Sequence, residues 1–185
     1  MRTPTDAVAY AADLASSGSS EWHDKCLYFV RTCYAVAGKY SSAAIAWIHT
    51  TKRGTGGAPF GAPHWWTGGS AGFGHVTIDA GSGYCYSSDF GPNGYVGDGK
   101  IRKVPVTAIS AHVPNLVYRG WSRDLNDVQV VPESGPIFPN WKVTHKNGSY
   151  GIFKPPVPGQ SAFPAASSRA LEIARTEYWV KLERA

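Results

Sequence analysis

Hydrophobic and polar residues follow a helical period in the first 50 or so residues of the chain and a strand period after His75. The first helix is predicted to begin at Thr5-Asp6, where a short polar residue precedes a run with regularly spaced alanines, and to end in the Ser/Gly loop at residues 16–20. A second helix is predicted from about Trp22 or Cys26 to Ala37, with Gly38 as its stop. A third, short helix is predicted from Ser42 to about His49.

The second half of this region changes character. Residues 51–74 are rich in glycine and are predicted to be mostly loop around a short strand at His64-Trp65-Trp66. Four segments with a period of two follow and are predicted to be strands: 75–79, 84–88, 101–104 and 116–118. Helices followed by strands with short turns between them indicate an α+β domain with N-terminal helices packed on an antiparallel β-sheet.

The composition divides the chain into three parts. Residues 1–131 are predicted to form one compact domain. Residues 132–166 are rich in proline and glycine with little periodicity, which is typical of a linker. Residues 167–185 are predicted to form an amphipathic C-terminal helix, with Ser168 as its N-cap and Leu171, Tyr178 and Leu182 on one face.

Composition and charge exclude several classes of function. No apolar run is long enough for a membrane span, and the N-terminus lacks the apolar core of a signal peptide. The net charge is +5, but the basic residues are scattered, so no nucleic-acid partner is expected. The cysteine and histidine spacings match no zinc motif, and no phosphate-binding loop occurs, so neither a metal nor a cofactor is predicted.

The three cysteines offer a candidate nucleophile. Because three is an odd number, at least one thiol is not paired within the chain. Cys26 stands where the Ser/Gly loop gives way to the second helix, and the positive end of a helix dipole favours a reactive thiolate. Unpaired N–H groups in the first helical turn can also bind an oxyanion. Cys33 and Cys85 are predicted to be buried packing residues.

The candidate base is His75, at the start of an apolar strand after a glycine-rich loop. The hairpin that follows has two possible registers. A turn at Gly81-Ser82 places His75 opposite Ser88, whereas a turn at 81–83 places it opposite Asp89. Either partner can orient an imidazole, and Asp89 is the stronger one because its charge also stabilises the imidazolium.

At these residues the chain resembles the CHAP and NlpC/P60 peptidases, papain-like cysteine amidases and endopeptidases that cut bacterial peptidoglycan. More narrowly, it looks like the lysin peptidase domains of phages that infect actinobacteria. The matching elements occur in the family's order over about residues 5–130: residues 22–31 around Cys26, residues 61–66, Gly74-His75-Val76-Thr77-Ile78, Ser87-Ser88-Asp89, and residues 118–126. Lys25 departs from the families' patterns, which often have Gln or Asp before the cysteine, so backbone donors are the safer oxyanion hole.

The resemblance implies a papain-like NlpC/P60 (CHAP) fold and a peptidoglycan-degrading cysteine peptidase or amidase. Cys26 would be the nucleophile, His75 the general base and Asp89 the third residue, while Trp65 and Trp66 would line the substrate groove. The resemblance also implies synthesis in a host cytoplasm without a signal peptide and action on the wall after release. Two alternatives stay open: a catalytically inactive wall-binding or virion structural module, and a papain-like toxin that acts on protein.

Overall fold

The computed structural model describes residues 1–111, 113, 115–133, 141–145, 150–153 and 179–184. Its contacts divide the chain into two units, Met1–Gly135 and Pro136–Ala185. The larger unit combines helices with an antiparallel sheet, so the predicted α+β class is confirmed. Within the described residues, the helices are all too short or too polar to cross a membrane.

Three helices precede the main sheet. Helix α1 (Pro4–Ser17) begins after Thr3, whose hydroxyl accepts a hydrogen bond from the Asp6 N–H, and ends at Gly18 in the left-handed conformation. Helix α2 (Cys26–Tyr34) is shorter than predicted because Ala35, with φ of 54°, already takes the left-handed cap conformation. Helix α3 (Ala43–His49) begins after Ser42, whose hydroxyl caps the Ile45 N–H.

The main sheet has six strands, in the order β1-β8-β2-β3-β4-β7, and all neighbours are antiparallel. Their bounds are β1 (Arg53–Gly54), β2 (Pro63–Gly68), β3 (His75–Asp79), β4 (Tyr84–Ser88), β7 (Ile101–Pro105) and β8 (Leu116–Ser122). The strands β3 and β4 have the predicted bounds, and they pair in the second of the two registers, with Ile78 opposite Tyr86 and Asp79 opposite Cys85. Short two-residue ladders accompany the sheet: β5 (Phe90–Gly91) with β6 (Gly94–Tyr95), and β9 (Asp124–Leu125) with β10 (Val128–Gln129).

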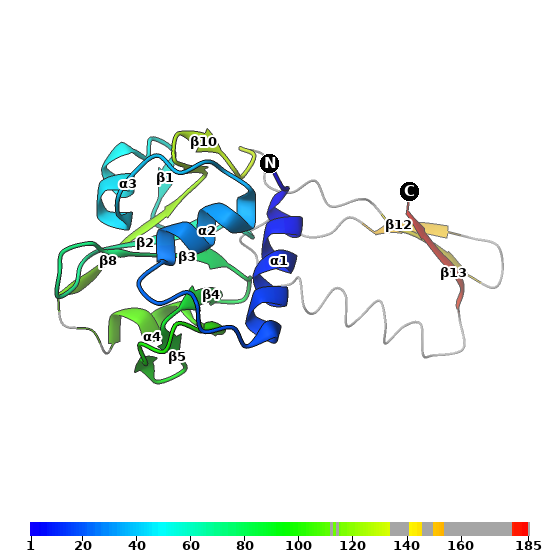
Figure 1. Ribbon diagram of the computed structural model, residues 1–185. Coiled ribbons are helices and arrows are strands. Elements are labelled where there is room, and N and C mark those ends of the chain that lie inside the picture. The colour runs from blue at the N-terminus through cyan, green and yellow to red at the C-terminus, as the bar shows by residue number, and fades with distance from the viewer. Residues whose placement is uncertain (112, 114, 134–140, 146–149, 154–178, 185) are drawn as a thin grey trace. The chain divides into compact units, whose positions relative to one another are not determined.

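The two faces of the sheet carry separate apolar clusters. Helices α2 and α3 pack on β3 and β2, whereas the short helix α4 (Val106–Ala111), which the sequence did not predict, contacts β7 and β8 (Figure 1). Trp65 belongs to the large cluster under the N-terminal helices, and Trp66 belongs to the smaller one with Cys85 and Ile109. Because neighbouring residues of a strand point to opposite faces, Trp65 and Trp66 pack β2 against the apolar clusters on the two faces of the sheet.

The smaller unit contains three antiparallel strands in the order β12-β11-β13: β11 (Trp141–His145), β12 (Tyr150–Phe153) and β13 (Trp179–Arg184). Two of them lie within the predicted linker, residues 132–166, which is therefore not free of regular structure. The predicted C-terminal helix, residues 167–185, is wrong at 179–184, which form β13. Its residues 167–178 lie outside the described part of the chain. Strand pairing depends on partners far along the chain, which local periodicity does not reveal.

Candidate active site

One pocket of about 820 Å³ lies beside the N-terminus of α2. Its wall comes from the start of α2, the segment 40–43 before and at the start of α3, the loop 68–75, and the region around β5 and β6. Cys26, His75 and Asp89 all line it. Three residues that are 49 and 14 positions apart in sequence therefore share one cavity of a size that suits a small ligand or a peptide segment.

Cys26 is the first residue of α2 and is partly exposed, whereas Cys33 and Cys85 are completely buried. All three are free thiols. Lys25 forms no side-chain cap on α2. The N–H groups in the first turn of an α-helix have no partner within the helix, and in α2 no capping side chain takes that place. These N–H groups point towards the N-terminal end of α2, where Cys26 stands.

The thiol of Cys26 is not the thiolate that a helix N-terminus was expected to favour. Burial raises its pKa to about 11, and this outweighs the opposite effect of hydrogen bonding to the backbone of Val76 and Leu27. The negative charges of Asp89 and Asp24 raise the pKa further. Helix α2 packs on β3, the strand that begins at His75, and Cys26 and His75 line the same pocket.

His75 is held from two sides. Before it, Gly74 has φ of 69°, and a Cβ there would lie 2.4 Å from the carbonyl oxygen of Trp66, so only glycine fits without displacement. On the other side, the Nε2 of His75 lies 2.8 Å from the Oγ of Ser87 in β4. The backbone turn and the cross-strand contact together fix the position of the ring.

The contact with Ser87 also selects the tautomer. Ser87 donates its hydroxyl hydrogen to the carbonyl oxygen of Ser88, 3.1 Å away. Because a hydroxyl carries a single hydrogen, its oxygen accepts from His75, whose Nε2 therefore carries the ring hydrogen. The lone pair is left on Nδ1, so Nδ1 is the basic atom.

The surroundings of His75 favour its neutral form. Its ring lies 4.8 Å from that of Phe90 and 6.0 Å from that of Trp66, centre to centre. Burial lowers the pKa of His75 to about 4, and only the charge of Asp89 acts in the opposite direction. At neutral pH the resting pair is therefore a neutral thiol and a neutral imidazole with a basic Nδ1.

The prediction that Asp89 orients His75 is wrong, and so is the alternative with Ser88. Asp89 has φ of 63° and follows the last residue of β4, and its carboxylate contacts His23, Asp24 and Gly99 instead of His75. The hydroxyl of Ser88 is buried without a hydrogen-bond partner. Ser87 occupies the orienting position instead. It lies two residues before Asp89 and so is the diagonal neighbour of His75 on the same face, which the hairpin geometry could have offered as a third choice.

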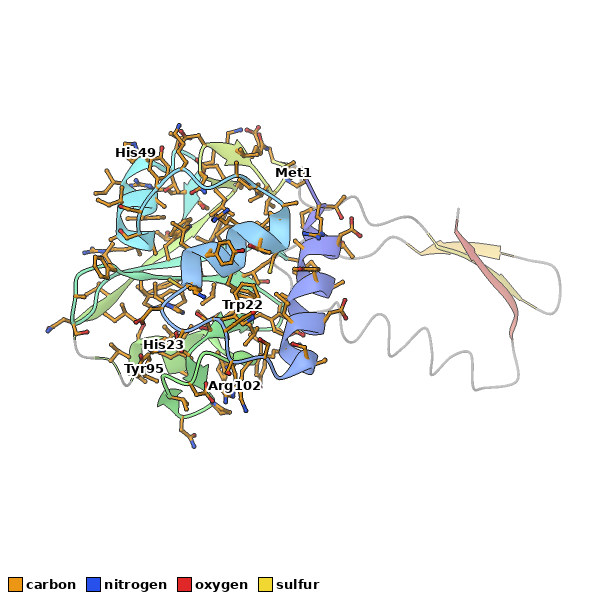
Figure 2. The ribbon with its side chains drawn as sticks, viewed as in Figure 1. Met1, Trp22, His23, His49, Tyr95 and Arg102 are labelled. Atoms are coloured by element: carbon orange, nitrogen blue, oxygen red, sulfur yellow. The ribbon has the colours of Figure 1, made fainter. Side chains whose placement is uncertain are left out.

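Asp89 holds the segment that leads into α2. Its two carboxylate oxygens accept hydrogen bonds from the N–H groups of Gly99 (2.8 Å) and Asp24 (2.9 Å), and the Nδ1 of His23 lies 3.0 Å away. This contact with Asp89 raises the pKa of His23. Figure 2 shows His23 on the segment before α2. Asp89 thus positions the residues immediately before Cys26 and acts on His75 through its charge alone.

The same three residues, His23, Asp24 and Asp89, form the one group of potential metal ligands in the described part of the chain whose atoms lie within 4.8 Å of one another. Both oxygens of Asp89 already accept N–H groups, and Asp24 is largely exposed. The group is accounted for by its own hydrogen bonds.

Trp65 and Trp66 cannot line a substrate groove, because both are completely buried and their indole N–H groups donate to Ser122 and Ser110. The exposed aromatic side chains at the pocket are others. Tyr28, Phe73 and Tyr95 line it and are 45%, 67% and 51% exposed. No local pattern distinguishes these roles, because tryptophans in a strand next to a glycine-rich loop are found both in the core and in a groove.

Comparison with known proteins gives no match to a protein-family model and no match to a curated protein.

Proposed function

We propose that the chain is a cysteine peptidase or amidase that degrades peptidoglycan, with Cys26 as nucleophile and His75 as general base. The observation that supports it is the shared pocket: Cys26, a partly exposed residue at a helix N-terminus, and an imidazole whose basic Nδ1 is not engaged by Ser87. A nucleophile, a base and a group that orients the base are the parts that thiol-based acyl transfer requires.

The reaction follows from the neutral resting pair. The sulfur of Cys26 attacks the amide carbonyl carbon while its proton passes to Nδ1 of His75, so the negative charge moves to the carbonyl oxygen and does not stay on the buried sulfur. The imidazolium then protonates the amine nitrogen, and the C–N bond breaks to leave a thioester. Water attacks the thioester with His75 as base, which releases the acid and restores the thiol.

The oxyanion is assigned to backbone donors. The first turn of α2 presents N–H groups without intrahelical partners beside the sulfur, and the helix dipole places its positive end there. Lys25 also lines the pocket, but its ammonium donates to the carbonyl oxygen of Glu21. The hole therefore requires no side chain from position 25.

The assignment to peptidoglycan rests on the resemblance to CHAP and NlpC/P60 peptidases, and the proposed papain-like fold rests on it as well. The pocket agrees with it in size and in its rim. A cavity of about 820 Å³ accommodates several residues of a peptide, and Tyr28, Phe73 and Tyr95 offer flat surfaces to sugar rings or peptide planes.

The test is digestion of purified actinobacterial cell walls, with mass analysis of the released fragments to identify the bond that is cut. Wild type is expected to release fragments, and Cys26→Ala is expected to release none. Cys33→Ala and Cys85→Ala are matched controls and are expected to keep activity, because both thiols lie in the core away from the pocket. Full activity of Cys26→Ala would refute the mechanism. Wall binding without cleavage by the wild type would favour the inactive binding module.

A further inference from the structure

Arg31 stands out among the charged residues of the pocket because its charge is not used. Asp24, Lys25, Arg31 and Asp89 line the cavity. The first two and Asp89 have hydrogen bonds or ion pairs within the domain. The guanidinium of Arg31 has neither a hydrogen bond nor an ion pair to any described residue, although the side chain is half-buried. A half-buried guanidinium without a hydrogen-bond acceptor has lost part of the hydration of its N–H donors, and nothing described replaces those hydrogen bonds.

The guanidinium is nevertheless held in place. Its Cζ lies 4.5 Å from the centre of the Tyr28 ring, one helical turn earlier on α2. It also lies against Gly38, where a Cβ would come within 3.2 Å of Cζ and 3.4 Å of each terminal nitrogen. Gly38 does not have a positive φ, so the backbone does not require glycine there. The space that Arg31 occupies is what a side chain at position 38 would disturb.

We propose that Arg31 is a binding site for a carboxylate of the substrate, and that the preferred substrate is an anionic peptide with a free carboxylate near the cleaved amide. The inference rests on the proposed function and names its substrate class. A guanidinium presents N–H donors in a planar fork that fits both oxygens of a carboxylate. Arg31 belongs to the same helix as Cys26 and lines the same pocket, so a carboxylate bound there belongs to the substrate that is attacked at Cys26.

The aromatic contact serves this role. The Cζ of Arg31 lies 4.5 Å from the centre of the Tyr28 ring, and this contact restricts the side chain before a ligand arrives, so less side-chain entropy is lost when a carboxylate binds. Lys25 is a poorer candidate, since its ammonium already donates to Glu21.

The experiment measures binding in the Cys26→Ala background of the full chain, so that no cleavage occurs. The probes are peptide stem fragments from a purified wall and the same fragments after a carbodiimide and ammonium have converted their carboxylates to amides. Arg31→Gln is expected to weaken binding of the carboxylate fragments roughly ten- to hundredfold, the usual effect of losing hydrogen bonds to a charged group. Binding of the amidated fragments is expected to be the same with and without Arg31.

Two further variants test the geometry. Arg31→Lys keeps the charge without the fork, and Gly38→Ala displaces the guanidinium while keeping it; both are expected to weaken binding of the carboxylate fragments less than Arg31→Gln does. Arg123→Gln is the matched control, because Arg123 also stacks on an aromatic ring, that of Trp121, but does not line the pocket. Unchanged thermal unfolding of each variant shows that it is folded.

The outcomes separate this inference from the proposed function. Equal loss of binding for carboxylate and amidated fragments, or no loss for either, overturns the role of Arg31 even if the wild type cleaves walls. Cleavage of carboxylate substrates by Arg31→Gln with an unchanged KM overturns it as well. Selective binding of carboxylate fragments that requires Arg31, combined with no cleavage by the wild type, supports the anion site and refutes the enzyme.

Discussion

Acidification is expected to destabilise the protein through His75. The residue is buried beside Phe90 and Trp66, and its pKa is lowered from 6.5 to about 4 in the folded state. Above pH 6.5 the imidazole is neutral in both the folded and the unfolded chain and contributes no pH dependence. Between pH 6.5 and 4 the unfolded chain takes up the proton and the folded chain does not, so stability falls as the pH falls and levels off below 4.

The size of the effect follows from these two values. At pH 5 the linkage relation gives a loss of about 2 kcal/mol relative to pH 7. With an unfolding slope of about 2 kcal/mol per molar urea, the midpoint of urea unfolding moves down by roughly 1 M. Tryptophan fluorescence is a suitable signal, because Trp65 and Trp66 are completely buried in the larger unit.

The assay measures the free energy of unfolding at several pH values for wild type and for His75→Gln. The difference between the two proteins removes the contributions of the other titrating groups. His23 is one of these groups. Because Asp89 raises its pKa, His23 makes the folded state more stable as the pH falls, which is the opposite of the effect of His75, and this contribution is the same in wild type and in His75→Gln. The loss between pH 7 and 5 is expected to be about 2 kcal/mol smaller in His75→Gln than in wild type. Parallel curves for wild type and His75→Gln would refute the account of His75 as a buried neutral base.

Three further predictions test the site. Ser87→Ala removes the acceptor of the His75 Nε2–H, and kcat/KM for wall-fragment hydrolysis is expected to fall roughly tenfold. The control Ser88→Ala removes a buried hydroxyl that has no partner among the described residues and is expected to keep activity. Loss of activity in Ser88→Ala but not in Ser87→Ala would contradict the assignment. Asp89→Asn replaces a carboxylate that accepts several N–H groups with an amide that is partly a donor. The free energy of unfolding in urea is expected to fall by about 1–3 kcal/mol, and the His23 pKa in an NMR titration is expected to be lower than in wild type. An unchanged His23 titration would count against the contact between Asp89 and His23. In Gly74→Ala the new Cβ would lie 2.4 Å from the carbonyl oxygen of Trp66, and the variant is expected to lose about 2 kcal/mol more stability in thermal unfolding than Gly72→Ala. Gly72 is the matched control because its φ is similar and the space around it is open. Equal losses would show that the backbone before β3 is not constrained at Gly74.

The local elements of the larger unit could be predicted because their signals are local. The apolar period located α1 to within about two residues, although the predicted cap at Thr5-Asp6 lies inside the helix and Thr3 is the N-cap. Helix α3 was located to within a residue, and alternation located β3 and β4 to the residue. Helix α2 was predicted too long because Gly38 looked like its stop, whereas Ala35 ends it and Gly38 makes room for the guanidinium of Arg31. The strand β13 was predicted to be helical because its pairing partner lies about 40 residues earlier in the chain.

The candidate site could be predicted in part. The motifs around Cys26 and His75 identified two residues that line one pocket, because a helix start and a strand start after a glycine-rich loop are visible in the sequence. The orienting residue was placed two positions away from Ser87, because the left-handed backbone of Asp89 breaks the register that the pairing rule assumes. The groove residues were misassigned because burial depends on how the two layers pack on the sheet and not on residue type.

By itself, the sequence determined the α+β class, the positions of most elements of the larger unit, and the location of Cys26 and His75 at the starts of a helix and a strand. These depend on periodicity, on capping and on residues near one another in the chain. The tertiary structure decided the protonation chemistry of the pair, the partner of the imidazole and the identity of the exposed aromatic residues. The physical reason is that pKa, tautomer and exposure depend on surroundings that come from several distant segments of the chain. Ser87 selects Nδ1 of the imidazole as the basic atom, and burial keeps Cys26 and His75 neutral. Trp65 and Trp66 pack in the core, so the exposed aromatic residues of the pocket are Tyr28, Phe73 and Tyr95.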